Sequence, residues 1–208
     1  DYTVEYSTDG STWSTFADGT STAVSATVTG LTNGTSYTFR VSAVSAVGVG
    51  TTSDTVSATP VAVPGQATGL TATPGNTQVA LSWTAPTDTG GSAILDYTVE
   101  YSTDESTWST FADGTSQRER STVTGLTNGT SYTFRIAAVS AVGAGNLSET
   151  VSATPAAVPG QPTVLTATPG NTQVALSWTA PTDTGGSAIS DYTVEYSTDE
   201  STWSTFAD

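Results

Sequence analysis

Apolar and polar residues alternate along much of the chain with a period of two. The segment TQVALSW places Val79, Leu81 and Trp83 on one side and smaller or polar residues on the other. The segments DYTVEYS (96–102) and SYTFRIAAV (131–139) show the same alternation. This period is typical of half-buried antiparallel strands, because successive side chains of a strand point to opposite faces. No helical stripe exceeds two turns, so we predict an all-β fold.

Short segments rich in Gly, Asn, Asp, Ser and Pro separate the predicted strands. They are TPGNT (73–77), TDTGGS (87–92), STDES (102–106), LTNGTS (126–131) and VGAGN (142–146). These residue types favour turns, because Gly adopts positive φ angles and Asn, Asp and Ser bond to nearby backbone. Seven short strands within about 95 residues predict a β-sandwich.

The whole pattern repeats along the chain. DYTVEY begins at Asp1, Asp96 and Asp191, a spacing of 95 residues. Residues 63–113 match residues 158–208 except at Ala67/Pro162, Gly69/Val164 and Leu95/Ser190. A period of this length is too long for a solenoid unit and fits one small domain.

Landmark residues follow one another in a fixed order within each repeat. A Pro-rich segment (VPGQATGLTATPG) leads to a strand that ends in Trp83, and DYTVEY follows. The segment TVTGLTNGTSYTFRIAAVSAVGAG then places Leu126 six residues before Tyr132. This order resembles that of the fibronectin type III domain, and the resemblance covers the whole chain.

The resemblance implies roles for three pairs of equivalent residues. Trp83 and Trp178 match the family's core tryptophan. Tyr37 and Tyr132 match its tyrosine-corner residue, whose hydroxyl bonds to backbone just upstream. Leu31 and Leu126 precede these tyrosines by six residues and are expected in the same core.

The resemblance also implies tandem seven-stranded antiparallel sandwiches. Residues 63–157 are expected to form one complete domain. Residues 1–62 are expected to hold the third to seventh strands of a preceding domain, and residues 158–208 the first four strands of a following one. The junctions TPVAVPGQ (59–66) and TPAAVPGQ (154–161) are short and contain proline, so we expect semi-rigid linkers.

The two partial domains raise the question of what completes them. A second copy could supply the strands that residues 1–62 lack, as in donor-strand polymers. However, both partial domains contain DYTVEY…TFAD, so joining them leaves one such segment surplus. We therefore expect the chain to be a segment of a longer repeat protein, with both ends continuing into further repeats.

Composition excludes several classes of function. The chain has 19 acidic and four basic side chains and a net charge of −15, which argues against binding nucleic acid or an anionic membrane. It has no Cys and no His, so disulfides, zinc–thiolate sites and Ser–His or Cys–His nucleophile pairs are impossible. A glycosidase with paired carboxylates is formally possible, but we interpret the acidic residues in the turns as solvated side chains. We therefore predict that this segment is not an enzyme.

Acidic residues near the predicted junctions suggest a possible calcium site. Stacked sandwiches would bring Asp104 and Glu105 to face the loop that contains Asp183 in the next domain. Carboxylate oxygens are suitable ligands for Ca²⁺. The alternative is that these like charges repel one another and favour an extended chain. We predict no other cofactor.

Half of the positive charge lies in the segment QRER (117–120), where the repeats diverge most. Arg118 and Arg120 suggest a contact with acidic side chains of another chain, so the expected partners are copies of this protein. The alternative is an exposed strand whose charges prevent edge pairing.

Three tryptophans follow the acidic turns. Trp13, Trp108 and Trp203 each stand in the tripeptide STW. They suggest platforms for glycans, but the favoured interpretation is that Trp108 packs with Phe111 at the sandwich edge.

Together these features predict a mechanical function. We expect a non-catalytic structural segment of a longer extracellular protein that forms a stalk, filament or surface layer. The resemblance to bacterial members of the family implies the extracellular or cell-surface setting. The alternatives are a glycan-binding surface adhesin and a spacer module of a secreted polysaccharide-degrading enzyme.

Overall fold

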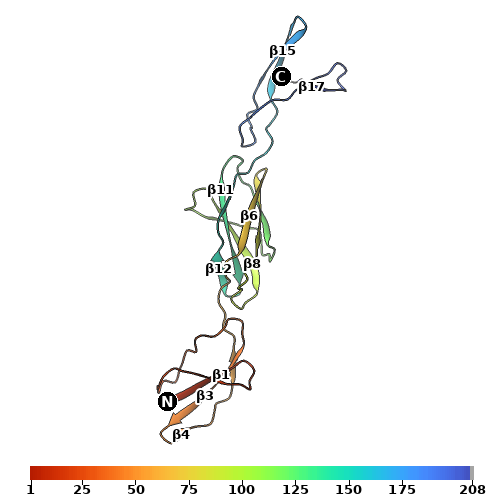
Figure 1. Cartoon of the computed structure of the whole chain (residues 1–208). Helices are drawn as coiled ribbons and strands as arrows, with labels where there is room; N and C mark the ends of the chain where they lie inside the picture. Colours follow the sequence, from red (N-terminus) through yellow and green to blue (C-terminus); the bar gives the residue numbers. More distant parts are fainter. Residues whose placement is uncertain (207–208) are drawn as a thin grey trace.

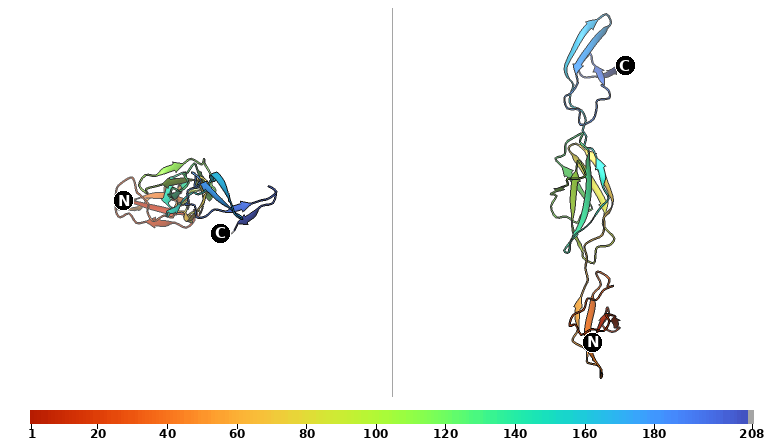
Figure 2. Two further views of the ribbon diagram at one scale, coloured as in Figure 1. Left: turned by 90° about the horizontal axis from the view of Figure 1, so that it is seen from above. Right: turned by 90° about the vertical axis from the view of Figure 1, so that its left-hand side faces the viewer.

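The computed structural model describes residues 1–206 as three units arranged in a line, with the two ends of the chain far apart (Figure 1). Turned by 90° about the vertical axis, the molecule shows the same extended arrangement (right panel of Figure 2). The regular elements of these residues are strands, and all their pairings are antiparallel. The predicted all-β fold is therefore confirmed. No helix within residues 1–206 is long and apolar enough to cross a membrane.

The middle unit is a complete two-sheet sandwich. One sheet has the strand order β10-β7-β6, formed by β6 (Thr68–Gly75), β7 (Gln78–Thr84) and β10 (Arg120–Thr124). The other has the order β12-β11-β8-β9, with β13 also paired to β11. Its strands are β8 (Ile94–Ser102), β9 (Ser109–Phe111), β11 (Tyr132–Ser140), β12 (Gly143–Leu147) and β13 (Val151–Ala153).

The last two strands, β12 and β13, both pair with β11 and act as one interrupted seventh strand. Ser148 lies in the interruption and replaces the missing ladder bonds. Its backbone amide donates to the carbonyl oxygen of Ile136 (2.8 Å), and its hydroxyl accepts from the amide of Ile136 (3.0 Å). The segment 142–146 was predicted as a turn, but most of it lies in β12. That prediction was wrong because Gly143–Leu147 pairs with β11, and the reversal takes place just before Gly143.

The core of the middle unit fills the space between its two sheets. Inward side chains of β7, β8 and β11 supply most of it, at the positions that the period of two predicted. The core residues with no accessible surface are Val79, Val99, Val123, Phe134, Ile136 and Ala138. Burying one large apolar side chain stabilises a fold by roughly 1.5–3 kcal/mol, so these strands are held mainly by their inward faces.

The landmark residues of the repeat lie at the edges of this core. Trp83 packs edge-on against Tyr97, with ring centroids 5.1 Å apart. The hydroxyl of Tyr132 accepts a hydrogen bond from the backbone amide of Thr127 (3.1 Å), and Leu126 beside it is buried. The tyrosine thus ties the loop between β10 and β11 (125–131) to the sandwich.

The first unit contains one sheet without a covering sheet. Its strands are β1 (Tyr2–Ser7), β2 (Ser14–Phe16), β3 (Tyr37–Ser45), β4 (Gly48–Val49) and β5 (Val56–Ala58). The hydroxyl of Tyr37 accepts from the amide of Thr32 (3.1 Å), as Tyr132 does from Thr127. Leu31, expected in the core, is only half-buried, because no counterpart of β6 and β7 covers it within residues 1–62.

The third unit consists of two hairpins. One is formed by β14 (Thr163–Gly170) and β15 (Gln173–Thr179), the other by β16 (Val194–Tyr196) and β17 (Ser204–Phe206). Trp178, expected in the core, is half-buried and packs only on Tyr192, with ring centroids 5.2 Å apart. The expectation failed because residues 158–206 contain no strand equivalent to β10 or β11. The predicted unit extends to residue 208, and residues 207–208 lie outside the described residues.

The tyrosine corner yields a stability prediction. Tyr132→Phe removes the acceptor for the amide of Thr127 and should lower the free energy of unfolding of the middle domain by about 1 kcal/mol. For a domain of this size, that loss lowers Tm by about 4–8 °C in thermal unfolding. Tyr101→Phe is the matched control, since its ring also packs at the core but its hydroxyl bonds to nothing within residues 1–206. Equal losses for the two variants would contradict the assigned role.

Candidate functional site at the domain junctions

The first linker is hydrogen-bonded to loops on both sides of it. The amide of Gly34, in the loop that precedes β3 within the first unit, donates to the carbonyl oxygen of Pro60 (2.9 Å). Two linker amides then bond to the loop between β7 and β8 (85–93) of the next unit. These bonds run from Ala62 to the oxygen of Gly90 and from Gly65 to the oxygen of Asp88, both at 2.8 Å. The linker is therefore fixed to both neighbours.

The second linker repeats this arrangement with the same distances. The amide of Gly129 donates to the oxygen of Pro155 (2.9 Å). The two bonds to the following loop run from Ala157 to Gly185 and from Gly160 to Asp183, both at 2.8 Å. Since each bond recurs at an equivalent position, the junction geometry is a property of the repeat.

Glycine backbones of neighbouring units touch at each junction. At the first, a Cβ added to Gly91 would overlap the backbone of Asn33 and Gly34. At the second, a Cβ added to Gly186 would overlap the backbone of Gly129. Both Gly91 and Gly186 also have positive φ angles, 77° and 88°, which favour glycine. Only glycine permits this approach of the two loops.

Side chains hold each of the contacting loops in shape. The Oδ1 atom of Asp88 accepts from the amide of Gly90 (2.8 Å), and Asp183 does the same for Gly185 (2.8 Å). On the other side, the side chain of Asn128 bonds to the turn between β6 and β7. Its Oδ1 accepts from the amide of Thr77 and its Nδ2 donates to Oδ1 of Asn76, both at 2.8 Å. The conformation of these loops is thus held by bonds within their own units.

The linker prolines and a neighbouring strand complete the junction. Pro64 of the first linker and Pro155 of the second are fully buried, whereas Pro159, the equivalent of Pro64, is exposed. The amide of Asn146 in β12 donates to the oxygen of Pro64 (3.1 Å). Sequence reasoning identified the linkers but missed the glycine contact. The recurrence of TNG at 32–34 and 127–129 and of TGG at 89–91 and 184–186 was the signal for it.

The proposed calcium ligands are engaged locally. Oδ1 of Asp104 accepts from Ser102 Oγ (2.9 Å) and from the amides of Ser106 (2.9 Å) and Thr107 (2.7 Å). Oε1 of Glu105 accepts from Thr133 Oγ1 (3.1 Å). Oδ1 of Asp183 accepts from the amide of Gly185 in its own loop (2.8 Å). Within residues 1–206, no three acidic side chains gather in a way that could hold a metal ion.

The acidic turn explains why Gly10 stands in the first repeat where the second and third have Glu105 and Glu200. Glu105 and Glu200 have positive φ angles of 57° and 60°, and Gly10 stands at the same place with 71°. A left-handed backbone costs glycine little, so Gly10 relieves strain that the two glutamates carry. The backbone conformation of the turn is therefore enough to explain glycine at position 10, and no contact with a neighbouring domain is needed.

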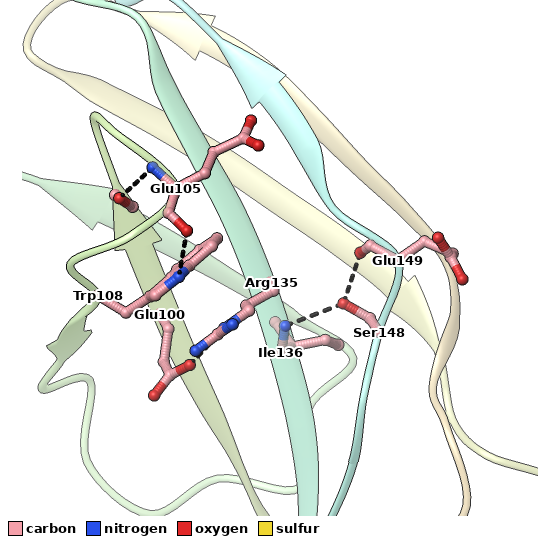
Figure 3. A network of polar contacts seen from close by, with 8 residues as sticks. Glu100, Glu105, Trp108, Arg135, Ile136, Ser148 and Glu149 are labelled. Carbon is pink, nitrogen blue, oxygen red and sulfur yellow. Dashed lines mark hydrogen bonds and ion pairs between the residues drawn. The ribbon is translucent and has the colours of Figure 1, made fainter.

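Trp108 stacks on an arginine of the outer sheet face (Figure 3). The Arg135 guanidinium lies 3.8 Å from the Trp108 ring centroid, and its Nε pairs with Glu100 (2.7 Å). The indole N–H donates to the backbone oxygen of Glu105 (3.1 Å). The favoured interpretation that Trp108 packs with Phe111 was wrong, since Phe111 packs on the core and Trp108 lies over Arg135.

The same stack recurs in the first unit but not in the third. Arg40 lies 3.9 Å from the ring centroid of Trp13 and pairs with Glu5 (2.8 Å). Trp203 is 58% exposed, because residues 158–206 contain no equivalent of Arg135. An arginine therefore covers one ring face of each stacked tryptophan. A glycan that stacked on these tryptophans would have only the other ring face.

Arg118 just before β10 and Arg120 at its first position are exposed and form no ion pair within residues 1–206. Arg120 pairs through its backbone with Ser82 of β7. A contact between these arginines and another chain stays a prediction.

The acidic turn gives a pH prediction. Hydrogen bonds from the backbone amides of Thr107 and Ser106, and then from Ser102, lower the pKa of Asp104 from 3.8 to about 2. Because the folded pKa lies below the unfolded one, the carboxylate stabilises the turn above pH 4, and this stabilisation is lost as the pH falls through 2. The carboxyl ¹³C shift of Asp104 should titrate near pH 2, and Asp104→Asn should abolish the parallel shift of the Thr107 amide. A midpoint near 3.8 would contradict this.

Comparison with known proteins agrees with this architecture. The family model described as "Fibronectin type III domain" matches residues 1–59 and 65–154. The chain is 33% identical to Myomesin-2 of Homo sapiens over 81% of its length, and 34% identical to Exoglucanase B of Cellulomonas fimi over 85%. It spans only 12% and 17% of those proteins. Titin domains A168–A170 superpose with a TM-score of 0.50 at 23% identity, over 74% of this chain and 54% of theirs, which shows a shared fold.

Proposed function

Since the chain belongs to the fibronectin type III family, we propose that it is a non-catalytic structural segment of a longer extracellular protein, whose domains are held in line to form a stalk, filament or surface layer. The observation that supports this most strongly is the repeated junction. Neighbouring domains in one chain usually move relative to one another unless their interface restrains them. Here the linker bonds to both sides, and the backbones of Gly34 and Gly91, and of Gly129 and Gly186, touch.

Two further features agree with a mechanical role. The repeats are nearly identical, so what the sequence preserves is the spacing of equivalent surfaces rather than one particular site. The chain resembles parts of Myomesin-2 and of Exoglucanase B, two differently named proteins. This agrees with a module that supports other parts of a protein.

The likeness to Exoglucanase B favours a second candidate, a spacer within a secreted polysaccharide-degrading enzyme. The coding sequence on either side of this segment separates the two candidates. Further copies of the 95-residue repeat support the stalk, whereas an adjoining hydrolase domain would favour the spacer and contradict the stalk.

The junction itself is tested by filling the glycine contact. Gly91→Ala with Gly186→Ala places a Cβ inside the neighbouring backbone and should force the domains apart, giving a broader distribution of interdomain angles. Small-angle scattering should then show a smaller maximum dimension than for the unchanged chain, and residual dipolar couplings of the middle domain should decrease relative to its neighbours.

Gly30→Ala with Gly125→Ala is the matched control. These glycines also have positive φ angles, 77° and 76°, but an added Cβ meets no atom within 4 Å. This control carries the same backbone cost without the junction clash and should retain the extended profile. If both double variants scatter like the unchanged chain, the glycine contact does not hold the domains in line.

A further inference from the structure

The dipeptide Asn128-Gly129 lies in the loop before β11, at the junction of the middle and third units. In an Asn-Gly pair the glycine nitrogen can attack the carbonyl carbon of the asparagine side chain, because glycine has no Cβ that hinders the approach. The side-chain nitrogen then leaves as ammonia, taking the proton of the glycine amide, and a succinimide ring forms. One water molecule opens the ring to aspartate or isoaspartate. This dipeptide thus contains both groups that deamidation requires.

Hydrogen bonds restrain both of the reacting groups. The Oδ1 atom of Asn128 accepts from the amide of Thr77, and its Nδ2 donates to Oδ1 of Asn76, both at 2.8 Å. The amide of Gly129 donates to the carbonyl oxygen of Pro155 (2.9 Å). The attack requires the side chain of Asn128 to rotate and the nitrogen of Gly129 to lose its proton. Each step breaks one of these bonds, so the folded chain opposes the reaction.

The next unit holds the attacking nitrogen in place. A Cβ added to Gly186 would overlap the nitrogen of Gly129, so the backbone of Gly186 lies directly against this atom. The loop that contains Gly186 is fixed to the linker by the bond from the amide of Ala157 to the oxygen of Gly185 (2.8 Å). Opening the junction therefore frees the nucleophile, whereas opening the bonds to the β6–β7 turn frees the side chain of Asn128.

We propose that Asn128 is a deamidation site that the closed junction protects, and that its conversion releases the two units from each other irreversibly. The chain itself supplies the nucleophile and the carbonyl group, and water is the only co-reactant. The proposal rests on the proposed function in one respect, namely that the junction restrains neighbouring domains. It goes beyond that function because it assigns a site of covalent modification and its consequence.

Both products of the reaction are incompatible with the present junction. Aspartate at position 128 replaces the Nδ2 donor by a carboxylate oxygen, which faces the Oδ1 acceptor of Asn76 without a proton between them. Isoaspartate also inserts a methylene group into the backbone and shifts Gly129 away from Gly186. No side chain lies between these glycines that could adapt to the shift. Because the covalent change persists, closing the junction again does not restore its bonds.

The reaction rate of Asn128 in the whole chain tests the protection. After incubation in mildly alkaline buffer, trypsin releases the peptide 121–135, which contains Asn128 as its only asparagine, and mass spectrometry measures its conversion from amide to acid. Gly186→Ala forces the second junction open and should raise the rate at least about tenfold, which corresponds to about 1.4 kcal/mol less free energy of opening. Gly91→Ala is the matched control, since it creates the same clash at the first junction and should leave the rate unchanged.

A second variant acts on the side chain rather than on the junction. Asn76→Ala removes the acceptor of Asn128 Nδ2, so Asn128 should deamidate faster while small-angle scattering shows the extended profile of the unchanged chain. Thermal unfolding of each variant verifies that the middle domain is folded during the incubation. Equal rates for Gly186→Ala and Gly91→Ala would overturn the proposal. So would an unchanged chain whose Asn128 reacts as fast as in the chain unfolded by urea.

Small-angle scattering tests the consequence and separates this proposal from the proposed function. Fractions in which peptide 121–135 is converted are isolated by anion exchange and should have a smaller maximum dimension than the unconverted chain. A converted chain that keeps the extended profile would contradict the release of the junction. If Gly186→Ala bends the chain but Asn128 reacts no faster, only the deamidation proposal fails. If Gly186→Ala stays extended, the glycine contact does not hold the domains in line, and the proposed function loses its main support.

Discussion

The packing of the β6–β7 hairpin across β8 and β11 is the interaction on which the rest of the structure depends. Where this hairpin is present, Phe134 and Ile136 are fully buried, β10 finds its ladder partner and the sandwich closes. Where it is missing, in residues 1–62, the same sheet forms but its inner face is open and residues 27–29 form no strand. The free energy of this fold therefore comes mainly from joining two sheets rather than from either sheet alone.

Hydrogen bonds within the middle unit fix the loops that this unit brings to the two junctions. Asn128 holds the loop before β11 by bonding to the β6–β7 turn, and Asp88 holds the loop after β7. These two kinds of loop then touch through glycine backbone, with no side chains between them. Contacts between backbones leave little freedom for adjustment, because there are no rotamers that could change. The first junction keeps the same linker distances although the sheet of residues 1–62 is uncovered, so this contact does not require a closed sandwich on both sides.

The candidate site was only partly predictable. The linkers follow from their proline and their place in the repeat, and the tyrosine corner follows from the resemblance to the fibronectin type III domain that Leu126 and Tyr132 help to carry. The contact between Gly34 and Gly91 did not follow, because a glycine in a turn is already explained by its φ angle, and sequence does not show that another backbone lies against it. The stacking of Trp108 on Arg135 was missed for a similar reason. It depends on β8 and β11 being neighbours, which places residues 27 positions apart on one outer face.

Identical segments of this chain separate what sequence determined from what tertiary structure decided. TQVALSW forms a strand both in β7 and in β15, so the alternation of apolar residues and the flanking turns determined the strands, the hairpins and which side chains face inward. The same residues are buried in one copy and exposed in the other, as Val79 at 0% and Val174 at 59% show. TVT is a strand at 122–124 and not at 27–29. Burial and strand pairing need a second sheet packed on the first, so identical residues differ in burial and pairing between the complete unit and the partial ones.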